Sequence, residues 1–152
     1  MITALKNFGV FILLLGGILL SASFVVPAQR PVDEFGYGTA EASMARLDAF
    51  FGELQNAPGA QGYIVVYGSK APKKGEIEVH FREMLVYFTA RRFPKEKITF
   101  INGGYRDANE VTLAFWIAAP GESAPKASNV LDIKQVKFQR GRFRGKSLYM
   151  CC

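Results

Sequence analysis

Tyr63-Ile64-Val65-Val66-Tyr67, bounded by Gly62 and Gly68, is the stretch that decides the fold of this chain. The run is continuous in β-branched and aromatic residues, and it contains no polar residue that would mark a solvent-facing side. This pattern predicts a strand at the centre of a sheet, in a parallel position and with both faces covered.

Apolar residues at helical spacing lie on both sides of this strand in the sequence. Thr39 can cap the first helix, with Glu41 in its first turn. One face of that helix would carry Met44, Leu47, Phe50, Phe51 and Leu54. The second helix would carry Ile77, Phe81, Met84, Leu85 and Phe88, and we expect Phe81, Leu85 and Phe88 to be buried against the sheet.

Three further segments predict strands. Residues 33–37 form a short first strand, residues 98–101 a third, and residues 111–118 a fourth in which apolar and small or polar residues alternate. The predicted order is β-α-β-α-β-β, and the last two strands can pair as an antiparallel hairpin. The fold class that follows is α/β, a two-layer α+β sandwich with a mixed sheet.

The N-terminal segment predicts export from the cytoplasm. No charged residue occurs between Lys6 and Arg30, and residues 8–20 are almost purely apolar, as in the core of a signal peptide. Val26-Pro27-Ala28 offers a small residue before a cleavage site. A retained membrane anchor over residues 8–28 is the alternative, so we expect a periplasmic or envelope-attached protein in either case.

Charge divides the remainder into two parts. Residues 29–119 hold eleven basic and eleven acidic residues, whereas residues 120–152 hold seven basic residues against two acids. Pro120-Gly121-Glu122-Ser123-Ala124-Pro125 marks the boundary between them. We therefore expect residues 1–28 to be the export segment, 29–119 a folded domain and 120–152 a basic C-terminal tail. The net charge of +6 does not mark a nucleic-acid-binding domain.

The layout of residues 33–119 resembles the OmpA-like domain, the peptidoglycan-associated part of many envelope proteins. The resemblance is carried by the order of elements, by residues 44–48 on the first helix, by the strand Gly62 to Gly68, and by Gly103-Gly104-Tyr105-Arg106. It implies a clamp for diaminopimelate in which an Asp after the second strand and an Arg on the second helix hold the ammonium and carboxylate groups.

Half of this clamp is present. Arg82 falls at the family's arginine position, with Val86 four residues later. The loop that should supply the acid reads Ser69-Lys70-Ala71-Pro72-Lys73-Lys74, so three lysines stand where an ammonium group would have to bind. A carboxylate from the region of Asp107 or Glu110 would then have to complete the clamp.

The candidate ligand-binding residues are therefore few. They are Arg82, Lys70, Lys73, Lys74 and Arg106. Each also has a purely structural interpretation: Arg82 can pair with Glu78 or Glu83, the lysine loop can be a solvated turn, and Arg106 can satisfy a local turn. His80 has no neighbouring pattern of a nucleophile, base or metal ligand, so we expect no enzymatic activity, no metal and no cofactor.

The tail and the chain end give the remaining interpretations. Basic residues alternate with aromatic ones after Val136, which suits an anionic surface such as lipid head groups, although a mobile tail is the alternative. Cys151 and Cys152 are disulfide candidates, more naturally between chains than with each other. We expect a non-enzymatic envelope interaction subunit with a protein or membrane partner. The alternative is a domain that binds peptidoglycan or glycan.

Overall fold

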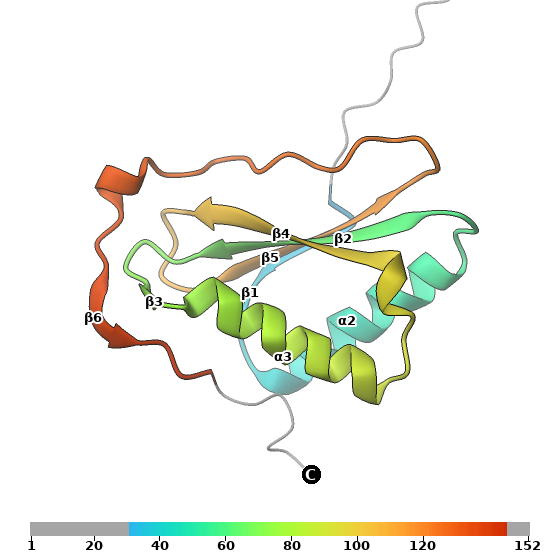
Figure 1. Ribbon diagram of the computed structural model, residues 1–152, viewed down its shortest axis with the longest axis horizontal. Coiled ribbons are helices and arrows are strands. Elements are labelled where there is room, and N and C mark those ends of the chain that lie inside the picture. The colour runs from blue at the N-terminus through green and yellow to red at the C-terminus, as the bar shows by residue number, and fades with distance from the viewer. Residues whose placement is uncertain (1–30, 146–152) are drawn as a thin grey trace, which may run out of the picture.

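The computed structural model describes residues 31–145, which form one α/β domain with a mixed sheet (Figure 1). The main sheet contains β1 (Asp33–Gly36), β2 (Gln61–Gly68), β4 (Ile98–Tyr105) and β5 (Thr112–Ala118). Two helices, α2 (Ala40–Gln55) and α3 (Glu76–Ala90), connect its strands. The smaller elements are β3 (Lys73–Lys74), β6 (Gln139–Arg142) and the 3-10 turns η1 (Lys95–Lys97) and η2 (Ile133–Gln135).

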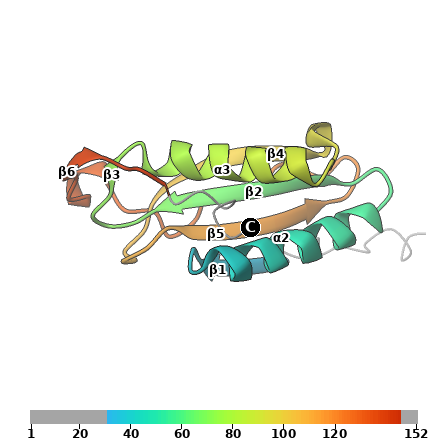
Figure 2. The same ribbon diagram turned by 90° about the horizontal axis from the view of Figure 1, so that it is seen from below.

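The strand order of the main sheet is β1-β5-β2-β4. β2 pairs in parallel with β4 and antiparallel with β5, and β1 pairs antiparallel with β5 on the other side. The predicted order of elements and the central position of the Tyr63–Tyr67 strand are therefore confirmed. The predicted antiparallel hairpin of the last two strands is wrong, because β2 lies between β4 and β5 and pairs with both. Both helices lie on one face of the sheet. In Figure 2, which views that face, α2 lies in front of the β1–β5 side and α3 in front of the β2–β4 side.

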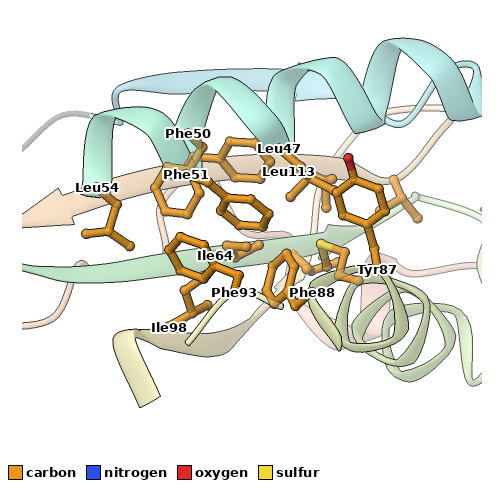
Figure 3. Close-up of a cluster of buried hydrophobic side chains, with 14 of the residues drawn as sticks. Leu47, Phe50, Phe51, Leu54, Ile64, Tyr87, Phe88, Phe93, Ile98 and Leu113 are labelled. Carbon is orange, nitrogen blue, oxygen red and sulfur yellow. The ribbon is translucent and has the colours of Figure 1, made fainter. Parts of the chain in front are cut away.

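The core lies between the helices and the sheet (Figure 3). The Phe51 ring from α2 stacks on Phe93 with centroids 4.2 Å apart, and it meets the Phe88 ring from α3 edge-on at 4.7 Å. Such aromatic pairs add to the free energy of burying the rings themselves. The predicted Thr39 cap is confirmed, because its hydroxyl accepts a hydrogen bond from the N–H of Ala42 at 3.3 Å.

The prediction for one face of α3 is wrong at Leu85. This side chain is 39% exposed, Phe81 is half-buried, and Phe88 is fully buried. The buried face instead passes through His80, Met84 and Tyr87. His80 and Tyr87 combine an aromatic ring with a polar atom, so a pattern that counts only aliphatic and phenyl groups places the centre of the face too far towards Leu85.

The opposite face of the sheet is covered by the chain that follows β5, residues 119–132, which we call the strap (Figure 1). Its Pro125 is buried, and the N–H of Ser128 donates to the Tyr67 hydroxyl at 3.4 Å. The Arg106 guanidinium lies 3.4 Å from the centre of the Tyr67 ring and donates from Nε to the Ser128 carbonyl at 3.2 Å. Residues after the expected boundary at 119 therefore pack on the domain.

No helix within residues 31–145 is long and apolar enough to cross a bilayer. The predicted signal peptide or anchor over residues 1–28 lies outside the described residues, and so do Cys151 and Cys152.

Candidate functional site

A cleft of about 300 Å³ opens between the first turns of α3 and the strand β6. Its walls are formed by Lys74, Glu78, Val79, Arg82, Arg142 and Phe143. Glu78 and Arg82 are one helical turn apart, so both project from the same side of α3. The cleft therefore collects three cations from three different elements and places one carboxylate beside them.

The loop before α3 fixes the position of Lys74. Gly75 has φ of 85°, a left-handed conformation that glycine adopts without cost, and it turns the chain from β3 directly into the helix. Glu76 is buried, and its carboxylate accepts hydrogen bonds from the Ser69 N–H at 2.9 Å and the Ser69 hydroxyl at 3.1 Å. This carboxylate ties the beginning of the lysine loop to the first turn of α3.

The other wall of the cleft comes from the C-terminal segment. β6 pairs in parallel with β3, with Arg142 in register with Lys74, and the N–H of Phe143 donates to the Lys74 carbonyl at 2.9 Å. The Phe143 ring lies 5.2 Å from the His80 ring, so it is held against α3. Part of the basic tail thus forms a strand, Gln139–Arg142, and this strand pairs with β3 rather than with the main sheet.

A buried polar cluster supports the side of α3 beneath Phe143. Oε2 of Glu83 lies 3.2 Å from His80 Nδ1 and accepts a hydrogen bond of 3.2 Å from the Tyr37 hydroxyl. The Tyr37 and His80 rings are 4.2 Å apart. Burial lowers the pKa of His80 to about 4 and raises the pKa of Glu83, whereas the nearby charge of Arg82 acts on Glu83 in the opposite direction.

This cluster is unsuited to acting on a ligand. The side chain of His80 is 4% exposed and that of Glu83 is 10% exposed, so neither presents a free group to solvent. The hydrogen bond from Tyr37 to Glu83, together with the contacts of the neutral His80 ring with the Tyr37 and Phe143 rings, instead holds the end of β1, α3 and the C-terminal segment together. The cleft itself is suited to binding a ligand. Its three cations can bind an anionic group, and its aromatic ring can contact an apolar part of the same ligand.

The sequence-predicted site residues are divided between this cleft and other places. Lys74 and Arg82 line it. Lys73 is exposed on β3, and Lys70 forms an ion pair with Asp107 at 3.2 Å. Arg106 lies elsewhere, under the strap, where it also donates to Oε1 of Glu34 at 2.5 Å.

Asp107 does not line the cleft, so the carboxylate that shares it with Arg82 is Glu78. The spacing of Glu78 and Arg82 was visible in the sequence, but it suggested an ion pair rather than two walls of a site. Arg142 and Phe143 were missed because nothing in the sequence indicates that β6 pairs with a two-residue strand far away in the chain.

No family model, curated protein or solved structure matches this chain. Within residues 31–145, no cluster of three histidine, cysteine or acidic side chains is arranged to hold a metal ion.

Proposed function

We propose that this chain is a non-enzymatic interaction domain of the cell envelope, and that its cleft binds an acidic group of an envelope protein partner. The observation that carries the proposal is the convergence of Lys74, Arg82 and Arg142 on one cleft with a single acid. Like charges held close together raise the local concentration of anions, and guanidinium groups bind carboxylates with two parallel hydrogen bonds.

Two sequence features support the location and the class of protein. The uncharged segment over residues 8–28 favours export, and the order of helices and strands is the layout on which the resemblance to the OmpA-like domain depends. That family works by binding rather than by catalysis, which agrees with a cleft that presents cations but no nucleophile.

A fluorescent glutamate-rich peptide tests the proposal by fluorescence anisotropy at physiological salt. Arg82→Gln should weaken binding about tenfold, because it removes a charge-assisted contact. Arg92→Gln is the matched control, since Arg92 is exposed just beyond the end of α3 and away from the cleft. Equal affinity of the two variants would show that the peptide responds only to overall charge.

A wall peptide is the second candidate, and Glu78 favours it. With Arg82, Glu78 provides one carboxylate and one guanidinium in the same cleft, which is the combination that a diaminopimelate zwitterion needs. The two candidates predict opposite effects of Glu78→Gln. The variant should bind a glutamate-rich peptide more tightly, because a like charge is gone, but it should lose affinity for a diaminopimelate-containing wall peptide in calorimetry.

A further inference from the structure

Three exposed apolar side chains belong to residues 130–138, the segment around η2. In the ribbon this segment lies at the same end of the molecule as β6 (Figure 1). Val130 is 45% exposed, Ile133 60% and Phe138 52%, and they are three of the six large apolar side chains that are exposed within residues 31–145. We call these three residues, together with the basic side chains around them, the η2 corner. Because exposing such groups to water is unfavourable, their concentration in one short segment indicates a contact surface.

The backbone of the η2 corner is held in place by hydrogen bonds. The N–H of Leu131 donates to the Tyr105 carbonyl at 2.8 Å, and Asp132 and Gln135 form a capping box around η2. The Phe138 ring meets the Tyr105 ring edge-on at 5.4 Å. The apolar groups are therefore presented by an ordered segment.

Basic side chains surround these apolar groups. Lys134, Lys137 and Arg140 belong to the same segment and are exposed. The N–H of Lys137 donates to the Lys70 carbonyl at 3.0 Å, which brings Lys70 alongside. The nearby acids are already engaged: Asp107 pairs with Lys70 at 3.2 Å, and the Asp132 carboxylate accepts from the N–H of Lys134 at 2.9 Å.

We propose that the η2 corner docks on the surface of an anionic lipid bilayer. Ile133 and Phe138 enter the head-group region, and Lys134 and Lys137 bind lipid phosphates. Protein–protein interfaces contain few lysines, and their centres are formed by contiguous apolar groups. Lysines that lie between exposed aliphatic and aromatic groups are instead typical of segments that bind at the surface of a membrane. Charge and partial insertion together provide the two contributions that stable attachment requires. The surface is separate from the cleft, since none of its residues lines the cleft.

Tryptophan fluorescence in the full chain tests this proposal. A tryptophan placed in the η2 corner reports on the surroundings of that corner and not on those of other segments. Phe138→Trp places an indole at the corner, and Leu85→Trp places one at another exposed apolar position, on α3. With vesicles of phosphatidylglycerol, the emission of Phe138→Trp should shift to the blue and be quenched by brominated acyl chains. Leu85→Trp should show neither change, and its spectrum also controls for Trp116.

Charge variants in the Phe138→Trp background complete the test. Adding Lys134→Gln and Lys137→Gln should weaken vesicle binding roughly thirtyfold, since each lysine near an anionic membrane contributes about fivefold. Adding Lys95→Gln and Lys97→Gln removes the same charge from η1 and should change binding little.

Three outcomes would overturn the proposal. The first is the absence of any shift, the second is an equal shift with neutral phosphatidylcholine vesicles, and the third is equal loss in the two pairs of charge variants. A shift produced by a glutamate-rich peptide but not by vesicles would assign the η2 corner to an acidic protein partner instead.

Discussion

Burial of His80 makes the stability of this domain depend on pH in a way that can be isolated by one substitution. The side chain is enclosed by Tyr37, Glu83 and Phe143, and burial lowers its pKa from 6.5 to about 4. In the unfolded chain the imidazole takes up a proton near pH 6.5, whereas in the folded domain it stays neutral until about pH 4. Folding stability from this group is therefore fully present above pH 6.5 and is lost as the pH falls to about 4.

The magnitude follows from the difference between the two pKa values. Each pKa unit corresponds to about 1.4 kcal/mol, so the contribution of His80 amounts to about 3 kcal/mol across this interval. The contribution of Glu83 to the pH dependence of stability has the opposite sign. Burial raises its pKa, so as the pH falls the Glu83 carboxylate takes up a proton in the folded domain before it does in the unfolded chain. The charge of Arg82 reduces that second effect.

Urea unfolding at pH 7 and pH 4 measures the effect, with His80→Phe as the comparison. Phenylalanine keeps a ring between Tyr37 and Phe143 but cannot be protonated. Between pH 7 and pH 4, the free energy of unfolding of the natural protein should fall by about 3 kcal/mol more than that of the variant. The contributions of Glu83 and the surface acids are present in both proteins and cancel in this comparison. A difference below about 1 kcal/mol would refute the reasoning, since it would mean that ionised Glu83 stabilises a charged His80 within the fold.

Three other predictions concern packing. Phe88→Ala should cost about 3–5 kcal/mol in chemical denaturation as a core truncation, whereas Leu85→Ala should cost less than about 1 kcal/mol; similar losses would contradict the assigned face of α3. Arg106→Gln should loosen the strap, so the amide of Leu131 should exchange with deuterium faster while the amides of α2 keep their rates. Gly103→Ala should destabilise the domain and lower its melting temperature, because the added Cβ would lie 2.5 Å from the buried Tyr67 ring; an unchanged melting temperature would argue against this close approach.

The main elements could be predicted because their signals are local. The Tyr63–Tyr67 run, the Thr39 cap and the periodicity of the two helices each depend on residues close together in the sequence. Leu85 was misassigned because the stripe on α3 is broad, and its centre is set by His80 and Tyr87. The rings of both residues pack against other aromatic rings, and the Tyr87 hydroxyl donates to Asp48.

The candidate site was harder to predict because it is assembled across the chain. Arg82 and Lys74 could be proposed from their positions around the second helix, but Arg142 reaches the same cleft only through the pairing of β3 with β6. Both strands are short, exposed and rich in cations, and like charges on neighbouring strands give no attractive signal. The backbone hydrogen bonds that align them have no counterpart in side-chain periodicity.

The pairing of β1 with β5 has a consequence for the order in which the chain can fold. β2, α3 and β4 are contiguous in the sequence and can form their parallel unit early, but β1 has nothing to pair with until residues 112–115 are in place. Until then the edge of β2 that receives β5 is open, and the unpaired backbone groups of this apolar strand, which includes Ile64 and Val65, are accessible to other chains. Closing the long loop between β1 and β5 costs chain entropy before any contact compensates for it. Insertion of β5 is therefore the step that we expect to limit the folding rate, and the interval before it is when aggregation competes most strongly.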